Sequence, residues 1–255
     1  MSLQDSQPGI SGAKLHWEKV YTEKPNDDQV SWFQQVPGTS LTLIQECSQF
    51  LRNENDTPQQ LIDIGSGNSN LVIELLKTCV KQQKDTEIPS LIRSFILVDI
   101  SGAALERTRD KLFKEVSREQ ISNEGLKVEF VESNVLLLDQ HTMFHSQIPS
   151  VDIWHDRATF HFLTDEQDQL SYLKVLSKML RVGGYFVLAT FSSNNGPKQC
   201  SGLPIVQYSV EKLEMLFEKV KDLMEFKCVK NFEQIHVTPF QTQQNFLFCV
   251  FQRVK

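Results

Sequence analysis

The sequence predicts an α/β fold with a doubly wound sheet of seven strands, mostly parallel and with the last strand antiparallel. The first observation is that short apolar runs alternate with amphipathic helical segments, which indicates right-handed β-α-β crossovers. The second is the terminal run FLFCVF, which is apolar at every position, as in a strand buried on both faces. The third is the short, turn-rich TPFQTQQ before it. This connection is too short for a crossover helix and therefore predicts an antiparallel final pair.

The positions of strands and helices follow from the spacing of apolar residues. Residues 40–51 carry apolar side chains at helical spacing, and Ser40 is a possible N-cap. The predicted strands are 60–65, 94–100, 126–134, 151–156, 185–191 and the two final runs FKCVKNFEQIHV and NFLFCVFQRV. The predicted helices are 70–82, 103–116, 166–181 and 209–220. Residues 16–34 are too irregular for a long helix and too aromatic for a linker, so we expect them to pack over the domain.

The composition is that of a globular protein and argues against several other classes. The chain is 40% apolar and 23% charged with a net charge of −6, so we expect no nucleic-acid partner. The five cysteines show no CxxC and no metal-ligand spacing with histidines, which favours reduced thiols and no metal site. No apolar stretch reaches the roughly 18 residues that span a bilayer, and residues 1–13 resemble no targeting signal. We therefore expect no membrane association, a cytoplasmic location, a flexible tail (1–13) and one domain (14–255) with an N-terminal cap segment (14–52).

The segment LIDIGSGNS, at the end of the first central strand, predicts a ligand site. In an open parallel sheet, ligands bind beyond the carboxyl ends of the strands. Gly65 and Gly67 allow a ligand to approach the backbone, but Asn70 stands where the dinucleotide-binding fingerprint needs its third glycine. Asp63 would repel a pyrophosphate and suits a cationic amino-acid group. The pattern therefore predicts a phosphate-free ligand that carries a positive charge, with helix capping as the alternative role of Asp63.

Five motifs, in this order, resemble those of the seven-stranded (class I) S-adenosylmethionine-dependent methyltransferases, from about residue 15 to the C-terminus. They are LIDIGSGNS, FILVDIS, VEFVESNV, VDIWHDRATFHFL and LRVGGYFVLATF. The resemblance implies a Rossmann-like methyltransferase domain with S-adenosyl-L-methionine as cofactor, bound by Asp63, Gly65, Ser66, Gly67, Asp99, Ile100, Asn134 and Val135. Asp99 would accept hydrogen bonds from the ribose hydroxyls and Asn134 from the adenine amine. The sequence departs from the family at Ser69, where a third glycine often stands, and at Asn134, where Asp is common.

Two further groups of residues are candidates for the site. Tyr21 and Trp32 belong to an aromatic N-terminal arm, and we expect them either to contact the cofactor or to staple the arm to the domain. Asp156 and His155 are the predicted catalytic residues, with the Asp156 carboxylate beside the sulfonium, where it would orient an incoming amine. The structural alternative for this cluster is an ion pair between Asp156 and Arg157 at a strand end.

The methyl acceptor follows only in part from the sequence. DRATFHFL together with GPKQCSGLPIVQY is similar to the thiopurine methyltransferase group, and WEKVY is similar to enzymes that methylate protein lysines. We therefore expect a protein side chain, with lysine favoured, or a small-molecule N or S acceptor. The alternatives are an NAD(P)-dependent oxidoreductase and a non-catalytic cofactor-binding module. The oligomeric state stays open.

Overall fold

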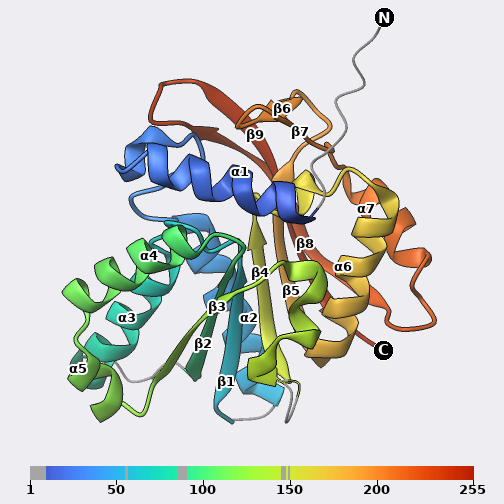
Figure 1. Ribbon diagram of the computed structural model, residues 1–255. Helices are drawn as coiled ribbons and strands as arrows, with labels where there is room; N and C mark the ends of the chain where they lie inside the picture. Colours follow the sequence, from blue (N-terminus) through green and yellow to red (C-terminus); the bar gives the residue numbers. More distant parts are fainter. Residues whose placement is uncertain (1–9, 55–56, 86–90, 145–147, 149) are drawn as a thin grey trace, which may run out of the picture.

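The computed structural model describes residues 10–54, 57–85, 91–144, 148 and 150–255, so residues 1–9 of the predicted tail lie outside it. Its main sheet has seven strands in the order β3-β2-β1-β4-β5-β9-β8 (Figure 1). These strands are β1 (Gln59–Ile64), β2 (Ile92–Asp99), β3 (Lys127–Glu132), β4 (Val151–Arg157), β5 (Leu180–Phe191), β8 (Phe226–Val237) and β9 (Gln243–Arg253). Neighbouring strands from β3 to β5 are parallel, and β9 is antiparallel to both β5 and β8. This topology confirms the predicted sheet.

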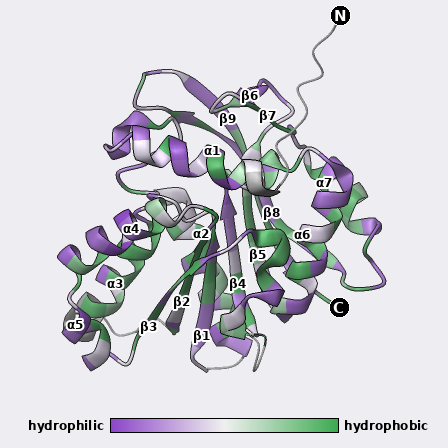
Figure 2. Cartoon of the chain, viewed as in Figure 1, coloured by the Kyte–Doolittle hydropathy of each residue, from purple (hydrophilic) through white to green (hydrophobic). Residues whose placement is uncertain are grey.

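Helices cover both faces of the sheet. The helices that follow the N-terminal one are α2 (Gly38–Glu54), α3 (Leu71–Asp85), α4 (Gly102–Glu115), α5 (Arg118–Asn123), α6 (Glu166–Met179) and α7 (Val210–Glu218). The connections hold the short elements η1 (Asp27–Gln29), η2 (Val135–Gln140), η3 (Thr142–Phe144), η4 (Phe160–Phe162), β6 (Gln199–Cys200) and β7 (Leu203–Pro204). Both hydrophilic and hydrophobic stretches occur on the outer helices, as in amphipathic helices (Figure 2). No helix in the described part of the chain is long and apolar enough to cross a membrane.

Alternation along each strand divides the core into two clusters. In β1, Leu61 joins the cluster that includes residues of α2, α3 and α4, whereas Ile62 joins the cluster with α6, α7 and η2. In β9, Phe248 and Leu247 are divided between the two clusters in the same way. The strand β9 lies between β5 and β8, which confirms that the apolar run FLFCVF belongs inside the sheet.

The N-terminal segment contains a helix that the sequence analysis misses. Helix α1 (Ile10–Glu23) begins within the predicted tail and ends two residues before Pro25, so the expectation that no long helix forms in residues 16–34 is wrong for the first part of that segment. Trp17 and Tyr21 lie one turn apart and give α1 an aromatic face. The helix crosses the carboxyl ends of the parallel strands (Figure 1). Its stability comes from this packing, which a local sequence pattern does not reveal.

Candidate functional site

Bare backbone forms the turn after β1. Gly65 and Gly67 have φ angles of +63° and +44°, in the left-handed region that favours glycine. A Cβ atom on Gly65 would overlap Oγ1 of Thr159, and one on Gly67 would overlap the hydroxyl of Tyr21. Glycine is therefore required at both positions, because the loop after β4 and the helix α1 approach the turn closely.

Asp99, the last residue of β2, joins this turn to the neighbouring strand. Its Oδ2 accepts a hydrogen bond from the Gly67 N–H at 2.8 Å, and its Oδ1 accepts one from the Ser101 N–H at 2.8 Å. Burial raises the pKa of the Asp99 carboxyl to about 6. Each carboxylate oxygen can accept a further hydrogen bond, so Asp99 can still bind a ligand that donates to it.

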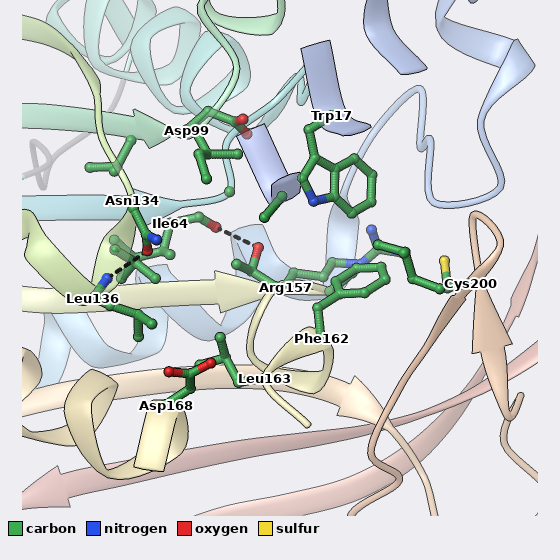
Figure 3. Close-up of a pocket in the computed structure, with 18 of the residues that line it drawn as sticks. Trp17, Ile64, Asp99, Asn134, Leu136, Arg157, Phe162, Leu163, Asp168 and Cys200 are labelled. Carbon is green, nitrogen blue, oxygen red and sulfur yellow. Dashed lines mark hydrogen bonds between the residues drawn. The ribbon is translucent and has the colours of Figure 1, made fainter. Parts of the chain in front are cut away.

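A cavity of about 470 Å³ lies between the strand ends and α1. Figure 3 shows Asp99 and Asn134 at one end of it and Cys200 at the other, with Arg157 and Phe162 between them. Seven of the ten residues predicted to bind the cofactor line this cavity: Tyr21, Trp32, Gly65, Asp99, Ile100, Asn134 and Val135. The structure thus brings together residues from the N-terminal arm and from the ends of three strands.

Two sets of contacts hold α1 over the cavity. The Glu18 carboxylate accepts hydrogen bonds from the backbone N–H groups of Gly102 at 2.7 Å and Ala103 at 3.3 Å, at the N-terminus of α4. In return, Arg107 of α4 donates to the carbonyl oxygens of Tyr21 and Lys24, near the C-terminal end of α1. Each helix therefore supplies a charged side chain to the end of the other. This pair of contacts holds α1 over the cavity.

The end of the cavity near β3 holds amide and carboxylate acceptors. Oδ1 of Asn134 accepts a hydrogen bond from the Leu136 N–H at 2.9 Å, so part of its acceptor capacity is used locally (Figure 3). Asp168 of α6 lines the same cavity, and burial together with the nearby Asp165 raises the pKa of its carboxyl. Sequence analysis did not single out Asp168, because its place on the cavity wall depends on how α6 packs.

Asp63 and Ser66 lie in a smaller hollow of about 40 Å³, which shares Gly65, Trp32 and Arg157 with the larger cavity. Oδ1 of Asp63 lies 2.7 Å from Nδ1 of His155, and Nε2 of His155 lies 2.9 Å from Oγ of Ser40 on α2. Oδ2 of Asp63 and Oγ of Ser66 are buried and have no hydrogen-bond partner within the described residues. The hollow therefore contains a free carboxylate oxygen and a free hydroxyl, as the site of an ammonium group requires.

The predicted catalytic residues Asp156 and His155 do not line the cavity of about 470 Å³. Asp156 is fully buried and is not on the cavity wall. Its Oδ1 accepts from the N–H groups of Thr159 and Phe160, both at 3.1 Å, and its Oδ2 accepts from the Tyr172 hydroxyl at 2.8 Å. Burial raises the pKa of this carboxyl to about 6. The chain turns back after β4, so the Asp156 carboxylate caps its own loop.

Arg157 does not form the predicted alternative ion pair with Asp156. Its side chain instead runs along the cavity, and among the described residues no ion pair involves it. Cys200 lines the same part of the cavity, and burial raises the pKa of its thiol, which favours the protonated form. No group of three or more metal-binding side chains occurs in the described ranges.

Comparisons with known proteins agree with this fold. The model of a methyltransferase-domain family matches residues 56–246. The N-methyltransferase NodS from Bradyrhizobium japonicum, in complex with S-adenosyl-L-homocysteine, is 14% identical with a TM-score of 0.61, over 94% of this chain and 99% of that one. A 1,6-didemethyltoxoflavin N1-methyltransferase from Burkholderia thailandensis is 16% identical with a TM-score of 0.60, over 100% and 94%.

A third solved structure, magnesium protoporphyrin IX methyltransferase from Synechocystis PCC 6803 with bound S-adenosylmethionine, is 10% identical with a TM-score of 0.58, over 97% and 99% of the two chains. At these identities the similarities establish the fold. None of the curated proteins matches the sequence.

Proposed function

Because the chain belongs to a family of methyltransferase domains, we propose that it transfers a methyl group from S-adenosyl-L-methionine to a nitrogen or sulfur atom of a small molecule. The observation that carries the donor half of this proposal is the hydrogen bond from the Gly67 N–H to the Asp99 carboxylate at 2.8 Å. It places a buried acceptor beside bare backbone at the strand ends, where ligands of parallel sheets bind.

The chain offers a partner for each part of the donor. Asp99 would accept hydrogen bonds from the ribose hydroxyls, and Asn134 and Val135 would frame the adenine. The free Oδ2 of Asp63 would bind the ammonium group across the glycine turn, while His155 holds the other carboxylate oxygen. These assignments retain the predicted cofactor residues and give His155 a positioning role.

Bound S-adenosyl-L-methionine would supply an electrophilic methyl group on its sulfonium sulfur. The chain itself contributes alignment and exclusion of water. Trp17 packs edge to face on Phe162 with ring centroids 5.0 Å apart, and on Trp32 at 5.7 Å, so aromatic rings enclose the cavity beneath α1. Asp156 holds the loop that carries Thr159 and Phe160, and we assign it a positioning role as well.

The enclosed site supports a small acceptor better than a lysine on a folded protein. A lysine side chain would have to enter beneath α1, which Glu18 holds at its middle and Arg107 at its C-terminal end. An entering ammonium group would also meet Arg157, and no acid pairs with this guanidinium within the described part of the chain. Both features therefore support a small molecule.

Calorimetric titration with S-adenosylhomocysteine and NAD, followed by transfer of a labelled methyl group in cell extract, tests the function. We expect S-adenosylhomocysteine to bind and NAD not to bind, and the label to appear in the small-molecule fraction. Label on a protein band would contradict the proposed acceptor class. Binding without any transfer in extract would favour a non-catalytic module, and binding of NAD alone would favour an oxidoreductase.

A further inference from the structure

The Arg157 guanidinium lines the cavity and forms no ion pair with any of the residues that the structure describes. Its Nη1 donates to the Trp32 carbonyl oxygen at 2.9 Å. Its Nε and Nη2 are buried, and neither has a hydrogen-bond partner within the described residues. Burial lowers the pKa of Arg157 to about 10, so the group still carries its charge at neutral pH. A buried cation with two free donors is costly unless an anion binds it.

The guanidinium lies at the end of the cavity away from the proposed nucleoside site. Its carbon lies 4.8 Å from the centre of the Phe246 ring, which belongs to β9. In the sheet, β9 follows β5, whereas Asp99 ends β2 on the other side of β1. Figure 3 shows the same separation, with Arg157 extending from its strand toward Phe162 and Cys200 and away from Asn134. A ligand group bound by Arg157 would therefore lie over β5 and β9.

The surroundings of this end are neutral or basic. The ring of His161 stacks on Phe191 at 4.3 Å, and burial lowers the pKa of His161 to about 3, so the imidazole is uncharged. His236, on β8, is bonded through Nε2 to the Ser31 carbonyl oxygen at 2.7 Å, and burial lowers its pKa as well. Cys200 completes this end of the cavity with a protonated thiol. Among the residues that the structure describes, no carboxylate forms an ion pair with the guanidinium.

We propose that Arg157 binds a carboxylate of the methyl acceptor, whose planar apolar body packs against the aromatic residues Trp17, Trp32 and Phe162. This inference rests on the proposed function and adds the chemical class of the substrate. A guanidinium with two free donors matches a carboxylate in a two-point hydrogen bond. The aromatic rings supply the apolar walls that bind a planar body.

The donor molecule also carries a carboxylate, so the two sources must be separated. The free oxygen of Asp63 and the free hydroxyl of Ser66 place the donor's amino-acid group in the hollow beside the glycine turn. Arg157 borders this hollow as well, but its guanidinium carbon lies 4.8 Å from the centre of the Phe246 ring on β9, on the side of the cavity away from Asp99. We therefore assign it to the acceptor.

The experiment uses the full chain saturated with S-adenosylhomocysteine and measures binding of matched acids and amides by calorimetry. The probes are indole-3-acetate with indole-3-acetamide, and 4-hydroxybenzoate with 4-hydroxybenzamide. We expect the acids to bind about tenfold or more tightly than the amides, as a charge-assisted pair implies. In Arg157→Gln this preference should disappear, while Arg157→Lys should retain part of it. Arg181→Gln, which removes an outlying ion pair with Asp152, should leave it unchanged.

Three results would overturn the assignment. One is a wild-type protein that binds no acid more tightly than its amide, and this comparison stands even if Arg157→Gln does not fold. Another is an acid preference that persists unchanged in a folded Arg157→Gln. The third is a tenfold loss of S-adenosylhomocysteine affinity in Arg157→Gln with unchanged affinity for 5′-methylthioadenosine, which lacks the amino-acid group. This result would mean that the guanidinium binds the donor's carboxylate. Failure of the proposed function differs from all three, because the wild-type protein would then not bind S-adenosylhomocysteine.

Discussion

The Asp63 carboxylate lies 2.7 Å from Nδ1 of His155 on the neighbouring strand, and both side chains are buried. The second ring nitrogen of His155 lies 2.9 Å from the Ser40 hydroxyl, so a chain of three polar groups connects β1, β4 and α2. This chain occupies one oxygen of Asp63 and leaves the other free in the hollow beside the glycine turn. The structure thus fixes the orientation of the Asp63 carboxylate, which we propose binds the donor's ammonium group.

Replacement of Asp63 by Asn should weaken binding of S-adenosylhomocysteine by about 1–3 kcal/mol, because a charge-assisted hydrogen bond to the ammonium becomes a neutral one. Ser40→Ala removes only the outer hydrogen bond of the chain and should cost about 1 kcal/mol of folding stability with little change in affinity. Calorimetric titration and urea unfolding of both variants separate the two effects. Equal affinity of Asp63→Asn and wild type would remove Asp63 from the donor site.

The affinity for S-adenosylhomocysteine should depend on pH through Asp99. Burial raises the pKa of this carboxyl to about 6, and only the ionised form can accept both ribose hydrogen bonds. Ligand binding favours the ionised form, so affinity should fall about tenfold per pH unit as the pH drops below about 6. Titrations between about pH 5 and 8 measure the slope. Asp99→Asn should bind more weakly and flatten the profile below pH 6, and an unchanged profile in this variant would assign the pH dependence to another group.

Substitution of Gly67 by Ala should disrupt both the turn after β1 and the packing of helix α1 over that turn. The residue has a φ of +44°, and a Cβ atom there would overlap the Tyr21 hydroxyl, so α1 would have to move. We expect a loss of about 1–2 kcal/mol from the backbone conformation and a further loss of ligand affinity. Adding Tyr21→Phe removes the overlapping hydroxyl and should recover part of the affinity. Calorimetry of the single and double variants checks this, and no recovery would mean that the backbone strain alone is responsible.

The positioning role of Asp156 predicts a stability effect that depends on pH. Burial raises the pKa of this carboxyl to about 6, above its ordinary value of 3.8, so the native state holds the proton more tightly than the unfolded chain. Its contribution is therefore fully present below about pH 4 and is lost as the pH rises through about 6. Asp156→Asn should reduce this loss, and Tyr172→Phe, which removes the hydrogen bond to Oδ2, should raise the pKa of Asp156 further.

Urea unfolding between about pH 4 and 8 measures both effects. The same variants also distinguish a positioning role from catalysis. A residue that acts as a general base contributes about 10²- to 10⁴-fold to the rate, with little effect on stability. We expect Asp156→Asn to lower stability by about 1–3 kcal/mol and to leave the folded fraction active. A rate loss of the catalytic size in a fully stable Asp156→Asn would restore the catalytic interpretation.

The sequence by itself determined the sheet and the strand ends at which the proposed donor site lies. Alternating apolar runs predicted the strands, and the apolar FLFCVF predicted a strand inside the sheet, because burial on both faces leaves no polar face in the sequence. The short connection before this run predicted its antiparallel direction. Gly65, Gly67 and Asp99 were identified because strand ends and left-handed glycines have local signatures.

Only the tertiary structure decided what each polar side chain does at those strand ends. Asp63 and His155 are 92 residues apart in sequence, and no local pattern reveals that they contact each other. Whether a carboxylate such as Asp156 faces a cavity or its own backbone depends on the path of the next loop. Whether an acid pairs with the Arg157 guanidinium depends on which side chains other strands place near it. Helix α1 forms for the same reason, because contacts made with distant residues outweigh a weak local preference.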